Sequence, residues 1–189
     1  MSQTVPTHDP LRLSIHDLPH QAGAHKDFLI DFVADQEWNN GVVFPQRDTA
    51  MKADVSMTSV GDGVLIHLRT SVPTTTQCGR CLDPVTDEID IDLQEVFFSP
   101  ELRQAALDEG DEDAEDMRVI EQESVDLSEL LRDNLVLSMP FQPLCDPECL
   151  GLCPGCGMRM EDAEEGHAHE VIDPRWAALS AWKTEENDE

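Results

Sequence analysis

Four cysteines lie within twelve residues near the end of the chain, and their spacing suits a metal ion. Cys153 and Cys156 form a Cys-x-x-Cys turn, in which two thiolates can point at one soft, tetrahedral cation. The intervening Pro-Gly and the following Gly157 permit the tight backbone of such a turn. The first expectation is therefore about one zinc ion, bound by Cys153 and Cys156 with Cys145 and Cys149 completing a four-thiolate set.

Other donors compete for this ion. His167 and His169 follow the cysteines after a short loop, and a His-x-His pair can supply one or two nitrogen ligands. A separate Cys-x-x-Cys pair, Cys78 and Cys81, can reach across from the predicted sheet to form a two-knuckle site. Free thiols without metal are a further interpretation. A dithiol redox centre is less favoured, because such centres sit at a helix N-terminus whereas Cys78 follows a predicted strand.

The charge of the chain restricts the kind of partner. It has 40 acidic and 12 basic residues, which gives a formal net charge of −28 at pH 7. The basic residues are scattered from Arg12 to Lys183 without a cluster, so the chain lacks the basic patch that grips a phosphate backbone. We expect no direct nucleic-acid binding and instead a cationic protein as partner. Solubility alone is the simpler explanation of the charge.

Several classes of protein lack support in the sequence. No apolar run approaches the roughly 20 residues that span a bilayer, and the first ten residues lack the features of a signal peptide. The expectation is a cytoplasmic protein without membrane contact. There is no Gly-x-Ser-x-Gly motif and no glycine-rich phosphate loop. We therefore expect neither enzymatic activity nor a small-molecule substrate.

Alternating apolar and polar residues predict an antiparallel sheet. The turn residues Gly61-Asp62-Gly63 predict a hairpin between two of its strands. A later strand places Glu88, Asp90 and Asp92 on the solvent side, so the sheet should have an acidic outer face. The stretch 17–27 has the composition of a loop. Expected strands cover residues 11–15, 51–57, 64–68, 74–77 and 85–93.

A very acidic stretch follows the predicted sheet. Seven of the nine residues in 108–116 are acidic, so we expect a mobile loop over about 101–116 and a return strand over 117–122. A helix is expected over about 126–138, because four leucines recur there at helical spacing. Asp126 and Glu129 have the spacing of an N-terminal capping box.

These elements predict an α+β fold. Residues 1–144 should form an antiparallel β-sheet domain with one packed helix. Residues 145–189 should form a small Cys-rich zinc module and a short helix that begins at Asp173-Pro174.

Several sequence blocks resemble one known family. They are Cys78-Gly-Arg-Cys-Leu-Asp-Pro84, Asp126-Leu-Ser-Glu-Leu-Leu131, Leu137-Ser-Met-Pro140, Cys149-Leu-Gly-Leu-Cys-Pro-Gly-Cys-Gly157 and Asp173-Pro-Arg-Trp-Ala-Ala-Leu179. From about Met51 to Trp182 the chain is similar to the YceD family of large ribosomal RNA subunit accumulation proteins. The resemblance implies a bacterial cytoplasmic protein that supports accumulation of large-subunit (23S) ribosomal RNA. Many relatives carry Cys-x-Cys where this chain has His167-Ala-His169.

The resemblance and the charge together favour one function. The leading hypothesis is a non-enzymatic factor in large-subunit assembly that binds a basic ribosomal protein or a pre-ribosomal particle. One alternative is a direct RNA-binding zinc protein, although residues 145–169 contain a single lysine or arginine, Arg159. The other is a thiol redox protein, for which only the cysteine content argues.

Overall fold

A computed structural model describes residues 9–19, 21–169 and 175. The chain divides into two compact units. The first consists of Met1–Thr76 and Val85–Pro143 and holds nearly all of the regular secondary structure found in the described residues. The second consists of Gln77–Pro84 and Leu144–Glu189 and holds the cysteines. The α+β class expected from the sequence is confirmed, with antiparallel sheets, helices and cysteine clusters.

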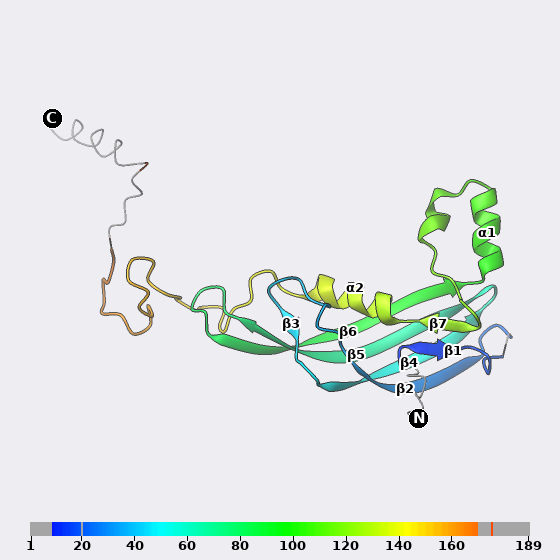
Figure 1. Cartoon of the computed structure of the whole chain (residues 1–189), viewed down its shortest axis with the longest axis horizontal. Coiled ribbons are helices and arrows are strands. Elements are labelled where there is room, and N and C mark those ends of the chain that lie inside the picture. Colours follow the sequence, from blue (N-terminus) through cyan, green and yellow to red (C-terminus); the bar gives the residue numbers. More distant parts are fainter. Residues whose placement is uncertain (1–8, 20, 170–174, 176–189) are drawn as a thin grey trace, which may run out of the picture. The chain divides into compact units, whose positions relative to one another are not determined.

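A five-stranded sheet forms the body of the first unit (Figure 1). The long strand β5 pairs with β4, with the short strand β3 and with β6, and β2 pairs with the other edge of β4. The strands are β2 (His25–Val33), β3 (Phe44–Pro45), β4 (Ala50–Val60), β5 (Gly63–Gln77) and β6 (Pro84–Phe98).

The predicted hairpin is confirmed. Strands β4 and β5 are joined by Gly61 and Asp62, and the pairing begins at Val60 opposite Gly63. Gly61 has a positive φ of 61°, which glycine adopts without strain. A Cβ on Gly63 would lie 2.6 Å from the backbone oxygen of Phe97, so only glycine fits at the start of β5.

The expected third strand over 74–77 is not a separate strand. It is the end of β5, which runs without interruption to Gln77. Pro73 suggests a break in the sequence, but it lies between the stretch of β5 that pairs with β4, ending at Thr70, and the stretch that pairs with β3, at Thr74 and Thr75. A proline there interrupts neither of these two ladders.

The sequence did not predict β2, which begins inside the expected loop 17–27. Nine consecutive residues of β2 pair with β4, from His25 opposite Thr58 to Val33 opposite Ala50. Leu29 and Val33 are exposed apolar residues, so they obscure the alternation that identifies a strand.

A second, two-stranded sheet joins distant parts of the chain. The short strand expected over 11–15 is present as β1 (Arg12–Ser14) and pairs with β7 (Ser124–Asp126). The return strand expected over 117–122 does not form, because that stretch makes only isolated bridges, at Val119 and Glu121.

Helix α2 (Ser128–Ser138) confirms the predicted leucine-faced helix. Leu127, Leu130, Leu131 and Leu135 are buried in one cluster with the apolar side chains of the sheet. Figure 1 shows α2 lying along the sheet. The predicted capping box is wrong: the helix begins after Leu127, and the Asp126 carboxylate accepts a hydrogen bond from the Ser128 amide at its first turn.

The expected loop over 101–116 is wrong as well, because two helical segments form there, α1 (Pro100–Asp108) and the 3-10 helix η1 (Glu112–Asp116). The Ser99 hydroxyl accepts a hydrogen bond from the Leu102 amide and caps α1. The Arg103 guanidinium donates to the carbonyl oxygens of Ala114 and Glu115, 3.1 and 3.0 Å away, and ties the two segments together. We call residues 100–116 the acidic lobe.

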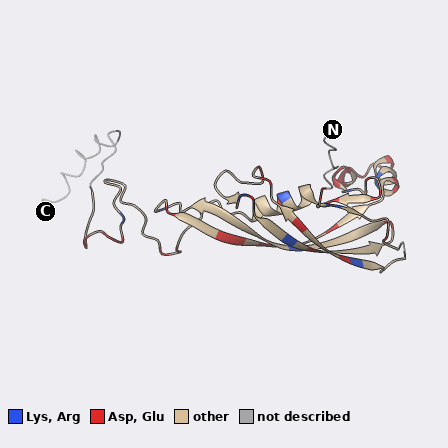
Figure 2. Cartoon of the chain, turned by 60° about the horizontal axis from the view of Figure 1, so that its bottom comes forward, with Lys and Arg blue, Asp and Glu red and all other residues tan. Residues whose placement is uncertain are grey.

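Figure 2 marks the positions of acidic residues in red, on the acidic lobe and along the strands. Within the described part of the chain, no helix is long and apolar enough to cross a membrane. The short helix expected to begin at Asp173-Pro174 lies outside the described residues.

Candidate metal centre

The eight candidate ligands form two separate groups in the second unit. The first expectation placed Cys145 and Cys149 in one site with Cys153 and Cys156. The structure does not bring these two pairs together. In each group the four donor atoms lie within 4.8 Å of one another. The first group is Cys78, Cys81, Cys145 and Cys149, and the second is Cys153, Cys156, His167 and His169.

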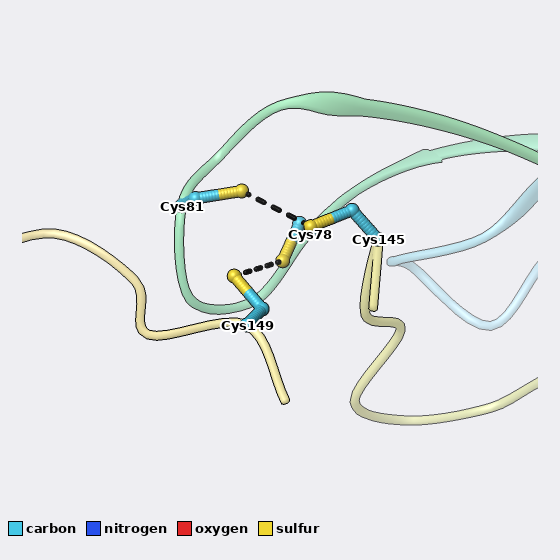
Figure 3. Close-up of side chains that lie close together, drawn as sticks. All are labelled: Cys78, Cys81, Cys145 and Cys149. Atoms are coloured by element: carbon cyan, nitrogen blue, oxygen red, sulfur yellow. Dashed lines mark hydrogen bonds between the residues drawn. The ribbon is translucent and has the colours of Figure 1, made fainter. Parts of the chain in front are cut away.

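The first group has the dimensions of a four-thiolate site (Figure 3). The Sγ atoms of Cys78 and Cys149 are 3.8 Å apart, and those of Cys81 and Cys145 are 3.5 Å apart. A tetrahedral zinc ion with Zn–S bonds of about 2.3 Å requires sulfurs about 3.8 Å apart. No disulfide links these cysteines, and Cys78 and Cys81 are buried. The residues present therefore fit a tetrahedral metal ion.

The turn between β5 and β6 places the first two thiols. The Cys78 amide donates to the Asp83 carbonyl over 2.8 Å, and the Leu82 amide donates to the Cys78 carbonyl over 3.0 Å. Leu82 has a positive φ of 64°, an unusual conformation for leucine that closes the turn. The Arg80 amide points at the Cys78 sulfur, 3.4 Å away.

Two thiols of this group, those of Cys78 and Cys81, have strongly shifted pKa values. The backbone N–H of Cys81, with those of Cys145 and Arg80, lowers the pKa of Cys78 to about 6. The backbone N–H of Asp83 lowers the pKa of Cys81, but burial and the three neighbouring thiols outweigh it and raise that pKa to about 12. One thiolate therefore forms readily, while further negative charge is resisted until a cation balances it.

Arg80 holds the second pair of thiols beside the first. Its guanidinium donates to the carbonyl oxygens of Cys149, at 2.8 Å, and Pro147, at 3.3 Å. The Leu152 amide donates to the Arg80 carbonyl over 3.1 Å. A Cβ on Gly151 would lie 3.0 Å from that same carbonyl oxygen, and Gly151 has a φ of +75°. Arg80, inside the first Cys-x-x-Cys turn, thus joins this turn to residues 147–152. The cysteine spacing alone did not predict this connection.

An ion pair also links the β5–β6 turn to the segment that follows Cys156. Arg159 pairs with Asp83 and also with Glu161, whose carboxylate oxygen is 2.9 Å away. The Arg159 guanidinium lowers the pKa of Asp83. The single arginine of residues 145–169 is therefore engaged inside the unit.

The second Cys-x-x-Cys turn is also built by backbone hydrogen bonds. The Cys153 amide donates to the Met158 carbonyl over 2.7 Å, and the Gly157 amide donates to the Cys153 carbonyl over 2.8 Å. The backbone N–H groups of Gly155 and Cys156 lower the pKa of the Cys153 thiol.

Comparison with known proteins gives consistent relatives. An uncharacterised protein of Mycobacterium tuberculosis (strain ATCC 25618 / H37Rv) and one of Mycobacterium bovis are each 42% identical over 135 residues, which cover 71% of this chain and 63% of the relative. An uncharacterised protein of Mycobacterium leprae is 33% identical over 127 residues, 67% of this chain and 56% of that protein. The chain thus spans about three fifths of the length of these relatives. No solved structure matches it significantly.

The family model for the large ribosomal RNA subunit accumulation protein YceD matches residues 66–183, more than half of the chain. The matched part includes both cysteine turns, the acidic lobe and α2. The chain therefore belongs to the YceD family.

Proposed function

We propose that the chain is a non-enzymatic factor that supports accumulation of 23S ribosomal RNA by binding a basic ribosomal protein or a pre-ribosomal large subunit. The family name gives the process. The observation that carries the mode of action is the net charge of −28, which repels nucleic acid and attracts cationic proteins.

The acidic lobe is the best-defined surface for such a partner. Its carboxylates are exposed, and they are held on two short helical segments that Arg103 links. A fixed acidic surface loses less conformational entropy on binding than a mobile loop does. Its acidic residues are Glu101, Asp108, Glu109, Asp111, Glu112, Asp113, Glu115 and Asp116.

The acidic outer face of β6 contributes less free negative charge for binding a partner than its sequence suggests. Asp92 accepts hydrogen bonds from His67, at 2.6 Å, and from Arg69, at 3.1 Å. Its charge is therefore partly balanced within the sheet. Glu88 and Asp90 are exposed on the same strand and add to the acidic surface.

We further propose that zinc occupies the first cysteine group in a structural role. Four thiolates with tetrahedral spacing and no open position suit a structural zinc ion. Bound zinc would supply the positive charge that balances the thiolates. It would also hold the β5–β6 turn and the segment around Cys145 and Cys149 together.

Direct RNA binding through this unit has little support. Residues 145–169 offer only Arg159, which is paired with Asp83 and Glu161. A cationic surface that neutralises several phosphates is the usual requirement for RNA affinity.

The proposal is tested by affinity capture from a bacterial lysate, with and without ribonuclease. We expect basic large-subunit proteins to remain bound after ribonuclease treatment. The double substitution Glu112→Gln and Glu115→Gln should slow their association. Asp27→Asn with Asp31→Asn is the matched control, because it changes the net charge equally at exposed residues of β2. Capture that is abolished by ribonuclease, or equally weakened by both double variants, would contradict the proposal.

A further inference from the structure

We propose that the chain binds a second zinc ion, through Cys153, Cys156, His167 and His169, at a site independent of the four-cysteine group. This inference goes beyond the proposed function, since it does not depend on which partner the acidic lobe binds.

The donor geometry fits a two-sulfur, two-nitrogen site. All four donor atoms lie within 4.8 Å of one another. The Cys156 Sγ is 3.4 Å from the His167 Nε2. A tetrahedral ion with Zn–S bonds of about 2.3 Å and Zn–N bonds of about 2.0 Å requires about 3.5 Å between sulfur and nitrogen. The distance between these two donors therefore suits zinc.

The two imidazoles are arranged as ligands of one ion. Their ring centroids are 4.8 Å apart, and their planes meet at 82°. The rings are therefore not stacked, and one nitrogen of each ring lies within 4.8 Å of both sulfurs.

Gly155 provides a second, independent sign that the site is built. A Cβ at this position would lie 2.5 Å from the Cβ and 2.6 Å from the Cγ of His169. The His169 side chain is thus held directly against the Cys153–Cys156 turn. Any side chain at residue 155 would displace it from the thiols.

The segment has little else to hold it in this conformation. Among the described residues 151–169, only Gly151 and Cys153 are buried. A segment without an apolar core usually derives its folding free energy from a metal ion.

The two sites should bind zinc independently of each other, because each group has its own four donor atoms. They differ in chemistry and access. The first has four sulfurs, two of them on buried cysteines. In the second, Cys156 and His169 are exposed. A chelator should therefore remove zinc from the second site first.

The experiment is elemental analysis of the whole chain, prepared without chelator. We expect two zinc ions per chain, about one after His167→Ala with His169→Ala, and about one after Cys78→Ser with Cys81→Ser. The control His16→Ala with His25→Ala removes two exposed histidines outside both groups and should retain two zinc ions.

Cobalt(II) substitution identifies which ligands are lost. The thiolate-to-cobalt absorption scales with the number of Co–S bonds, and two of the six in the proposed assembly belong to the second site. The double histidine variant should therefore lose about one third of this absorption. One zinc ion in the wild type that the double histidine variant retains, or two zinc ions in that variant, would overturn the proposal.

Gly155→Ala tests the site without removing a ligand, which matters if the histidine variant does not fold. Displacement of His169 should weaken zinc binding at the second site by about 10- to 100-fold. We expect this variant to release one zinc ion to a competing chelator under conditions where the wild type retains two. Retention of both ions would contradict the proposed role of His169.

Discussion

Removing the first cysteine pair should release the segment that follows residue 144 from the β5–β6 turn. The double variant Cys78→Ser and Cys81→Ser keeps the turn but deletes two of the four thiolates. In the wild type, the proposed metal ion at this group would link Cys81 to Cys145 and Cys78 to Cys149, pairs that are 64 and 71 positions apart. Closing a loop of this length with a covalent cross-link stabilises a protein by about 4 kcal/mol, and a tightly bound metal acts in the same way.

The Leu152 amide reports this release directly, because it donates to the Arg80 carbonyl and so bridges the two segments. A loss of about 4 kcal/mol corresponds to a roughly thousandfold increase in the population of the open state. Hydrogen exchange resolved by residue should show the Leu152 amide exchanging up to a thousandfold faster in the double variant. The Cys153 amide, which bonds to Met158 within the second turn, is the internal control and should change little.

Two outcomes would refute this reasoning. Unchanged exchange at Leu152 would mean that no metal links the segments. Simultaneous loss of protection in β4 and α2 would mean that the four-cysteine group supports the sheet as well as its own unit.

Three further predictions concern the first unit. Leu131→Ala removes a fully buried side chain of α2 and should lower the free energy of unfolding by about 3 kcal/mol in urea titrations, whereas Leu137→Ala, at a position that is 84% exposed, should change it by less than about 0.5 kcal/mol. Ser99→Ala removes the N-terminal cap of α1, a helix with no buried residues. This substitution should destabilise the helix by about 1 kcal/mol and reduce the helical signal in circular dichroism. The hydrogen bond from His67, aided by Arg69, lowers the pKa of Asp92. The ionised Asp92 carboxylate therefore stabilises the folded state at pH values above the ordinary carboxyl pKa, and this stabilisation is lost as the pH falls through the lowered pKa. Carboxyl-detected NMR titration should show this lowered pKa, and His67→Ala should raise it.

Alternation and helical spacing predicted the parts of the fold that bury one regular face. The β4–β5 hairpin and the leucine face of α2 are of this kind. Strand β2 was missed because Leu29 and Val33 are apolar on the exposed side. Nothing in the sequence of β2 shows that β4 supplies its partner.

The acidic lobe was missed for a different reason. Its composition predicts self-repulsion, but its structure depends on the Ser99 cap and on the contacts of Arg103 with two carbonyl oxygens. Such side-chain to backbone bonds are specific to the tertiary arrangement. A Ser-Pro pair before an alanine-containing stretch was the available signal for the start of the helix.

The sequence identified all eight donor residues of the two groups but not how they are divided. Cys145 and Cys149 lie close to Cys153 and Cys156 in sequence, which favoured one compact site. In the structure Arg80 and Gly151 bring the β5–β6 turn against residues 147–152, so that Cys145 and Cys149 join the distant pair. The remaining two cysteines are then left to the histidines.

The central claim is that the chain acts by binding a basic protein through its acidic surface. The most direct measurement compares the affinity of the whole chain for purified basic large-subunit ribosomal proteins with its affinity for naked large-subunit ribosomal RNA, over a range of salt concentrations. We predict that at least one of these proteins binds at low salt and that the RNA does not bind. The affinity for the protein should fall steeply as the salt concentration rises, because exposed charges are screened within about 10 Å at 0.1 M. Tight, salt-insensitive binding to the naked RNA, with no binding to any of the basic proteins, would contradict the account.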